Sequence, residues 1–145
     1  MDYIVEEYNG DTVNDLSSDY GSPELNALTY KIIGAAMEVY NTIGKGFSEA
    51  VYNDCLGIEL ESNGIRFVKE KKFEIVYRGI KMPHHYYADF IVEERVVLEI
   101  KAHSLLLEDH TKQVLNYLAA SKCKIGLIIN FGENSLKYKR VILTK

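Results

Sequence analysis

The sequence predicts an α/β domain in which helices flank a mixed sheet. Apolar residues recur at helical spacing in the first part of the chain, and from Arg66 onward the spacing changes to two. A helix-like segment then separates two strongly apolar strand-like runs, as in a crossover between parallel strands. With 145 residues, 47% of them hydrophobic, the chain has the size of one domain with a sizeable core.

Two helices are expected first. Ser22-Pro23-Glu24 marks the start of one helix, whose apolar stripe continues to Asn41. Gly44-Lys45-Gly46 interrupts the pattern, and Ser48 can cap a second helix that ends at Asn63-Gly64.

Strands follow the helices. The strands over 95–102 and 125–130 should be parallel, because a helix connects them in a right-handed crossover. The last strand should lie at the edge of the sheet. We expect strands over 66–77, 85–92, 95–102, 125–130 and 136–143, and a helix over 108–120.

Charge is distributed unevenly along the chain. Residues 1–24 hold seven acids and no Lys or Arg, which leaves 14 acids and 17 bases in the remainder. We therefore divide the chain into an acidic flexible arm, residues 1–22, and a single domain, residues 23–145. Six bases follow Ser121, and they form either a rim that contacts phosphates or a solvated basic edge; Lys137, Lys139 and Arg140 are the candidates for substrate contact.

The composition also bounds location and redox chemistry. No apolar run approaches the length of a membrane span, and the acidic start lacks the basic region of a secretion signal, so we expect a cytoplasmic protein. Cys55 and Cys123 lie far apart without metal-ligand spacing, which favours buried thiols over a disulfide or a zinc site.

The most informative segment is the apolar strand 96–101, which carries Glu99 and Lys101 on one face. Another acid, Asp89, lies ten residues upstream in a second strand-like run. A hairpin between these runs brings Asp89 beside Glu99. Two adjacent carboxylates repel each other unless a cation neutralises them, and their oxygen atoms suit Mg²⁺ or Mn²⁺.

The register of this hairpin decides whether the site can exist. A two-residue loop at Glu93-Glu94 would pair Asp89 with Leu98 and would place Glu99 on the opposite face of the sheet. We therefore predict a three-residue loop, Glu93-Glu94-Arg95, that pairs Asp89 with Glu99, or a bulge with the same effect.

The residue types suggest phosphodiester hydrolysis. A metal ion held by Asp89, Glu99 and the Ile100 carbonyl would polarise a phosphoryl oxygen and lower the pKa of a bound water. Lys101 would orient that water or neutralise charge that develops on the phosphate oxygens. Gln113 is either a group that positions phosphate or water, or an ordinary helix-surface amide.

Five ordered segments of the chain carry a resemblance to a known family. With them the chain resembles the PD-(D/E)xK nuclease superfamily, and within it the GxxExxY group, from about Leu28 to Val141. The segments are Gly46-Phe47-Ser48-Glu49-Ala50-Val51-Tyr52, Tyr87-Ala88-Asp89-Phe90, Leu98-Glu99-Ile100-Lys101-Ala102, Gln113-Val114-Leu115-Asn116-Tyr117-Leu118 and Leu127-Ile128-Ile129-Asn130-Phe131-Gly132.

The resemblance implies a restriction-endonuclease-like fold, a mixed four-stranded core sheet flanked by helices, here with an added edge strand. It implies that Asp89 and Glu99 bind the metal, that Lys101 is the catalytic lysine, and that Glu49 reaches the metal directly or through water. Glu49 also stands in the first turn of its helix, where a capping role remains open. Tyr52 is expected to pack in the core.

Two further side chains are candidates for substrate contact. Tyr117 lies one helical turn from Gln113, and His103 would share the face of Glu99 and Lys101 if the strand continued that far. The four histidines lack the spacing of a helical zinc motif, so structural zinc is not expected. Tyr86 and Tyr87 should point to opposite faces of their strand.

These observations predict a Mg²⁺- or Mn²⁺-dependent nuclease, with DNA favoured over RNA as its substrate. The alternative is a non-catalytic module on the same fold that binds nucleic acid or a protein. In a third interpretation, the acidic arm mimics nucleic acid and covers the cleft, which makes the protein autoinhibited. A short substrate track in so small a chain leaves a homodimer or a partner subunit open.

Overall fold

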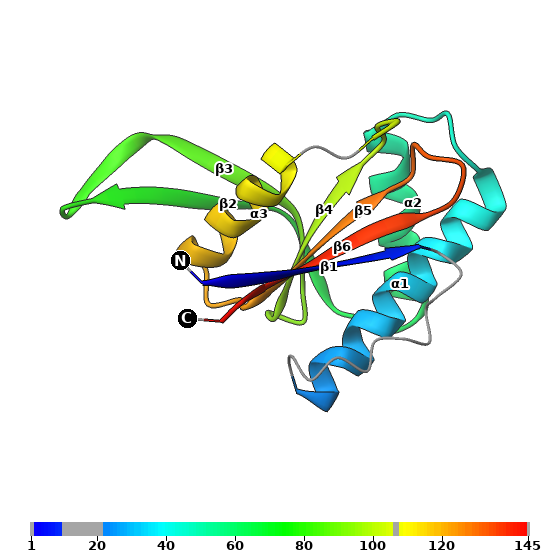
Figure 1. Ribbon diagram of the computed structural model, residues 1–145, viewed down its shortest axis with the longest axis horizontal. Coiled ribbons are helices and arrows are strands. Elements are labelled where there is room, and N and C mark those ends of the chain that lie inside the picture. Colours follow the sequence, from blue (N-terminus) through cyan, green and yellow to red (C-terminus); the bar gives the residue numbers. More distant parts are fainter. Residues whose placement is uncertain (1, 10–21, 106–107, 145) are drawn as a thin grey trace.

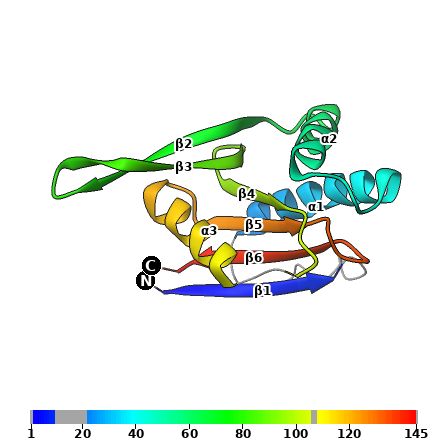
Figure 2. The same ribbon diagram turned by 90° about the horizontal axis from the view of Figure 1, so that it is seen from above.

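A computed structural model describes residues 2–9, 22–105 and 108–144. Six strands form one mixed sheet in the order β1-β6-β5-β4-β3-β2. Helices α1 and α2 cover one face and α3 covers the other (Figures 1 and 2). Two separate apolar clusters lie between these helices and the sheet, so the sheet is buried in its centre on both faces.

The predicted elements are confirmed, although β3 begins at Ile80, five residues before the expected start at residue 85. Ser22 and Ser48 both act as N-caps, because their side chains accept hydrogen bonds from Leu25 N and Val51 N. The described elements are β1 (Tyr3–Asn9), α1 (Pro23–Ile43), α2 (Glu49–Ser62), β2 (Phe67–Tyr77), β3 (Ile80–Val92), β4 (Val96–Lys101), α3 (Glu108–Ala120), β5 (Ile125–Asn130) and β6 (Lys137–Leu143).

Strand β4 divides its side chains between the two clusters. Leu98 and Ile100 pack on the α1–α2 side, whereas Val97 packs on the α3 side. Glu99 and Lys101 share the face of Val97 because side chains alternate along a strand. The parallel pairing of β4 with β5, predicted from the crossover, is confirmed from Val96↔Ile125 to Lys101↔Asn130.

Strand β6 is not an edge strand, contrary to expectation. Residues Tyr3–Asn9, assigned from the sequence to a flexible arm, form β1 and pair with β6 from Tyr3↔Leu143 to Asn9↔Lys137. Ile4 packs against one apolar cluster and Val5 against the other, so this short segment extends both faces of the core. The rest of the expected arm, residues 10–21, lies outside the described residues.

The proposed basic rim at β6 is also altered by β1. Arg140 is fully buried and bonds to Glu6 at 2.7 Å and to Asn26 Oδ1 at 2.6 Å, so it is a structural residue and not a substrate contact. Lys139 Nζ lies 3.2 Å from Glu7 Oε1, and Lys137 Nζ lies 3.2 Å from Glu133 Oε1. The acids of β1 thus neutralise part of the basic strand beside it.

The structure also describes the two cysteines and the lengths of the helices. Cys55 and Cys123 are free, and burial raises the pKa of the Cys123 thiol. None of the described helices is long and apolar enough to cross a membrane.

The Glu6–Arg140 pair leads to the first prediction. Glu6→Gln should lower the free energy of unfolding by about 3 kcal/mol, because it leaves a buried guanidinium without its carboxylate. Glu7→Gln is the matched control: Glu7 is 71% exposed, and the loss of its pair with Lys139 should cost less than about 1 kcal/mol. Urea unfolding measures both, and equal stability of the two variants would contradict the structural role of β1.

Candidate active site

The β3–β4 hairpin has the predicted register. Val92 pairs with Val96, Ile91 with Val97 and Phe90 with Leu98, so the loop is the three-residue segment Glu93-Glu94-Arg95. Glu93 and Glu94 adopt φ values of 51° and 60°, in the left-handed region that tight turns use. Continued by one residue, this register sets Asp89 opposite Glu99.

Beyond the Phe90↔Leu98 pair, hydrogen bonds from main-chain N–H groups to side-chain carboxylates take the place of the main-chain hydrogen bonds between β3 and β4. The main-chain N–H of Ile100 donates to Asp89 Oδ2 at 2.6 Å, and the N–H of Asp89 donates to Glu99 Oε1 at 3.4 Å. Each carboxylate therefore accepts a hydrogen bond from the strand that carries the other. This exchange holds the two acids at fixed positions beside each other, as a metal site requires.

Burial gives the acid pair an unusual charge state. The Glu99 side chain is 4% exposed, and burial followed by repulsion from Asp89 raises the pKa of Glu99 to about 8. Burial also raises the pKa of Asp89, although the Ile100 hydrogen bond and Lys101 oppose that shift. The pair therefore favours a bound proton or a bound cation near neutral pH.

Lys101 is the cation closest to the pair along β4. Its Nζ lies 3.9 Å from Glu99 Oε2, and the side chain is 14% exposed. At this distance the contact is a loose ion pair, beyond the range of a hydrogen bond. The ammonium thus stands within reach of a ligand bound at the two acids.

The loop before α2 brings Glu49 to the same place. Gly46 has φ +110°, a conformation that favours glycine. Tyr52 is buried, its hydroxyl donates to the Gly44 carbonyl at 2.6 Å, and it accepts from Phe47 N at 3.3 Å. Its ring stacks on Phe131 at 4.4 Å. Tyr52 is thus a core residue, as expected, and it fixes the loop that precedes Glu49.

Glu49 is the first residue of α2, but the side chain that caps the helix is that of Ser48, which accepts a hydrogen bond from Val51 N. Glu49 Oε1 lies 3.2 Å from His103 Nε2, and the charge of Glu49 raises the pKa of both Asp89 and Glu99. These interactions place Glu49 at the rim of the acid pair.

Asn130 is a site-supporting residue that sequence reasoning did not assign. It is buried at the end of β5, where its side chain accepts from His103 N at 3.0 Å and donates to the His103 carbonyl at 2.9 Å. A Cβ at Gly132 would collide with the main chain of Ala102 and His103, so glycine allows this close approach. The sequence feature that could have pointed to Asn130 is its position as the one polar residue at the end of an otherwise apolar strand. His103 lies beyond the end of β4 yet is held beside Glu49.

Helix α3 supplies a hydrogen-bonded chain that ends on β3, two residues before Asp89. Gln113 Nε2 donates to the Tyr117 hydroxyl at 3.1 Å, and that hydroxyl donates to the Tyr87 carbonyl at 3.0 Å. Tyr117 is buried, and burial raises its pKa. Tyr117 therefore positions β3 and Gln113; because it is buried, it does not offer the substrate contact suggested from the sequence.

Glu70 is a further acid near the pair, and its position there was not predicted from the sequence. It stands on β2 between the pairs Lys69↔Phe90 and Lys71↔Ala88, which sets it across from Asp89. Its φ is 53°, and its charge contributes to the raised pKa of Asp89. The β2–β3 register, which brings Glu70 here, was not deducible from spacing.

The donor chemistry of the pair fits a hard divalent cation. Asp89 and Glu99 offer carboxylate oxygens whose repulsion a cation would relieve, and Mg²⁺ commonly binds through one or two carboxylates and several waters. Within residues 2–9, 22–105 and 108–144, however, no group of three or more His, Cys, Asp or Glu side chains is arranged to hold a metal ion. The site thus supplies two ligands, and Glu49 bonds to His103 in place of completing the set.

The raised pKa of Glu99 leads to the second prediction. Without metal, Glu99 keeps its proton in the folded state up to about pH 8 but loses it in the unfolded state near pH 4.5. The unfolding free energy in EDTA should therefore fall as the pH rises from 4.5 to 8. Glu99→Gln should flatten this fall, and Glu38→Gln on α1 should keep it. Denaturant titrations across this pH range provide the measurement, and an unchanged slope in Glu99→Gln would refute the assignment.

Comparison with known proteins identifies the family. The model of the PD-(D/E)XK nuclease superfamily matches residues 26–141, which include all the site residues above. The fold is similar to that in the crystal structure of SSO0001, with a TM-score of 0.55 and 19% identity over 83% of this chain and 58% of that chain. No curated protein matches the sequence. With its restriction-endonuclease-like sheet and the acid pair at β3 and β4, the chain belongs to the PD-(D/E)XK nuclease superfamily.

Proposed function

We propose that this protein is a divalent-metal-dependent nuclease of the GxxExxY group that hydrolyses phosphodiester bonds in nucleic acid, with DNA as the first substrate to test. One observation carries the proposal. Asp89 and Glu99 lie side by side in a buried position where the pKa of Glu99 is about 8, and the Lys101 ammonium is 3.9 Å from Glu99. Two adjacent carboxylates removed from water destabilise a fold unless a proton or a cation neutralises one of them, and perturbed acid pairs of this kind are typical of functional sites.

The metal ligands in this proposal are Asp89, Glu99 and the main-chain carbonyl of Ile100, with Glu49 bound directly or through water. The oxygen donors suit Mg²⁺ or Mn²⁺. When bound, such an ion polarises a phosphoryl oxygen and lowers the pKa of its water. Glu49 would first have to leave His103, a contact between two partly exposed side chains that costs little to break.

The side chains around the acids have separable tasks. Lys101 neutralises charge that develops on the phosphate oxygens, and Gln113, oriented by Tyr117, positions the phosphate or the attacking water. His103 contacts the substrate at the rim. Lys137 stands in register with Asn130 and Lys101, and Lys139 stands in register with Ile128 and Glu99. These two lysines therefore lie in the same rows of the sheet as the site, where they can contact phosphate.

The acidic N-terminal segment favours a second, regulatory candidate. Glu7 pairs with Lys139, so β1 already occupies one of the proposed phosphate-binding lysines. Residues 3–9 pair with β6, and two strands, β6 and β5, separate them from β4, which carries Glu99, so they do not lie beside the acid pair. If this segment regulates the protein, it would do so by competing with the substrate phosphates for the lysines of β6. A cytoplasmic location and a homodimer or partner subunit belong to the same proposal.

The third prediction concerns metal binding. Mg²⁺ or Mn²⁺ at 100 times its dissociation constant should stabilise the fold by about 2.7 kcal/mol, visible as a raised melting temperature. Asp89→Asn and Glu99→Gln should abolish the shift, because each removes a ligand. Asp54→Asn, an exposed acid on α2, is the matched control and should keep the shift. A wild-type response in both site variants would mean that the ion binds elsewhere.

The fourth prediction concerns the chemical step. Labelled single- and double-stranded DNA and RNA should be cleaved with Mg²⁺ or Mn²⁺ and remain intact in EDTA. Lys101→Ala should slow single-turnover cleavage by about 100-fold or more while metal-induced stabilisation persists, because the ammonium acts mainly in the transition state. Lys112→Ala, an exposed lysine on α3, serves as control.

A different result supports the alternative function. If the wild-type protein binds nucleic acid but cleaves none with either metal, and Lys101→Ala behaves identically, the protein is a binding module on this fold.

A further inference from the structure

We propose that the outer part of the β2–β3 hairpin, residues 71–87, binds a single strand of nucleic acid and directs it to the acid pair. From here on this segment is called the arm, and the name no longer refers to the acidic residues 1–22. The inference deepens the proposed function, on which it rests, by assigning the substrate class and the surface that binds it.

The arm is an extension of the strand that carries Asp89. Pairing of β3 with β4 ends at Phe90↔Leu98, whereas pairing of β3 with β2 continues to Tyr77↔Ile80. The arm therefore projects from the body of the molecule (Figures 1 and 2). At about 3.3 Å per residue, the nine steps along the strand from Asp89 to Ile80 span roughly 30 Å. Asp89 belongs to the same strand as the arm, so a ligand bound along the arm would be directed toward the acid pair.

Aromatic contacts hold the base of the arm against the body. Phe73 and Tyr86 pair across the two strands, and their rings lie 5.7 Å and 5.8 Å from the ring of Tyr117 on α3. Tyr117 in turn bonds to the Tyr87 carbonyl. The arm thus keeps its direction relative to the site.

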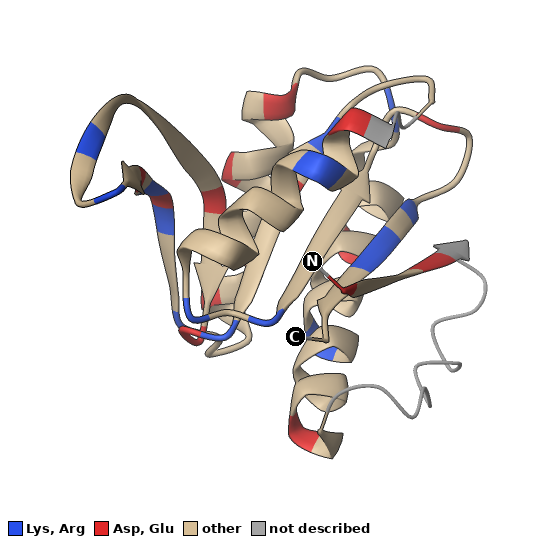
Figure 3. Cartoon of the chain, turned by 60° about the vertical axis from the view of Figure 1, so that its left-hand side comes forward, with Lys and Arg blue, Asp and Glu red and all other residues tan. Residues whose placement is uncertain are grey.

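The charge of the arm is opposite to that of the whole chain. The arm carries four bases, Lys71, Lys72, Arg78 and Lys81, and one acid, Glu74, which gives it a charge of +3 in a chain of net charge −4 (Figure 3). Glu74 Oε2 lies 3.0 Å from Lys81 Nζ, and Glu74 Oε1 lies 3.9 Å from Lys72 Nζ. The excess of positive charge matches the phosphates of a polyanion.

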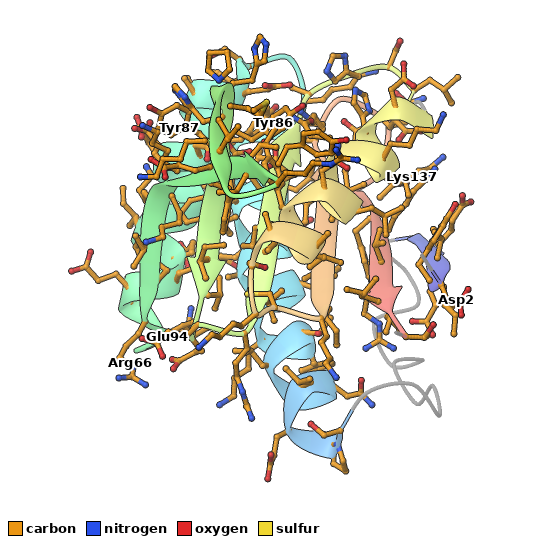
Figure 4. All side chains as sticks on the ribbon, turned by 90° about the vertical axis from the view of Figure 1, so that its left-hand side faces the viewer. Asp2, Arg66, Tyr86, Tyr87, Glu94 and Lys137 are labelled. Carbon is orange, nitrogen blue, oxygen red and sulfur yellow. The ribbon has the colours of Figure 1, made fainter. Side chains whose placement is uncertain are left out.

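Exposed aromatic rings accompany these bases. Tyr86 points toward α3, whereas Tyr87 points away and is 52% exposed (Figure 4). The expected divergence of these two tyrosines is thereby confirmed. The ring of His85 meets that of Tyr87 edge-on at 5.3 Å, and Lys72 is the cross-strand partner of Tyr87. This face of the arm combines a stacking surface with a cation.

The tip repeats the same combination. Tyr77 is exposed, and the guanidinium of Arg78 lies 5.4 Å from the centre of its ring. Bases stack on such rings with little sequence preference, and neighbouring cations bind the phosphates. Stacking on a tyrosine requires an unpaired base, because in a duplex each base face is covered by its neighbours. The arm therefore fits single-stranded nucleic acid better than a duplex.

The fifth prediction tests this inference by fluorescence anisotropy in EDTA, which separates binding from cleavage. The probe is a labelled deoxythymidine oligonucleotide of about 12 nucleotides, within the range that single-strand sites cover. Tyr77→Ser with Tyr87→Ser should weaken binding about ten-fold or more. Arg78→Gln with Lys81→Gln should make binding less sensitive to salt. The slope of the logarithm of the binding constant against the logarithm of the salt concentration should become less steep by about 1.4, or about 0.7 for each lost phosphate contact. Lys31→Gln with Lys124→Gln removes the same charge from α1 and from the residue before β5, and this variant should bind like wild type.

The possible outcomes separate the two proposals. Three results would each overturn the arm proposal. In the first, the arm variants bind as tightly as the control; in the second, the wild-type protein does not bind at all; in the third, the wild-type protein binds a duplex of equal length more tightly than the single strand. If the arm variants lose binding but no metal supports cleavage by the wild type, the arm proposal stands and the nuclease proposal fails. If cleavage occurs and the arm variants bind and cleave like wild type, only the arm proposal fails.

Discussion

The mutual repulsion of Asp89 and Glu99 is the constraint around which this structure is organised. Both acids are largely removed from water, and each is held in place by a main-chain N–H of the neighbouring strand. Such an arrangement costs free energy in the folded state unless a proton or cation is bound. The three-residue loop at Glu93–Arg95 makes the arrangement possible, since any shift of the register by one residue would separate the acids.

The surrounding elements orient groups toward this pair through bonds to the main chain. Tyr52 fixes the loop before Glu49, Asn130 fixes His103, and Tyr117 fixes the β3 main chain at Tyr87. All three are buried and come from three different elements, α2, β5 and α3. A site built this way keeps its geometry because the supporting side chains belong to the core.

Electrostatics also organises the two ends of the sheet. At one edge, β1 brings Glu6 and Glu7 to Arg140 and Lys139, so acids and bases that are far apart in sequence neutralise each other. At the other edge, the arm retains an excess of positive charge on exposed strands. The net charge of the chain therefore conceals two surfaces of different character, of which the arm is the better match for a polyanion.

The sequence by itself determined the elements and the central pair. Helical spacing, the caps at Ser22 and Ser48, and period-two runs depend on local physics, which is why the predicted helices and most strands agree with the structure. The acids Asp89 and Glu99 were identifiable because charges are conspicuous in apolar strands, and because only one hairpin register lets them meet.

Only the tertiary structure decided which distant residues join them. The pairing of β1 with β6 buries Arg140, and the twist and register of β2 set Glu70 across from Asp89. Tyr117 turned inward and Asn130 became a support for His103, because their roles depend on partners 30 and 27 residues away. Local spacing carries no information on such contacts, since long-range strand pairing is selected by the packing of the whole sheet.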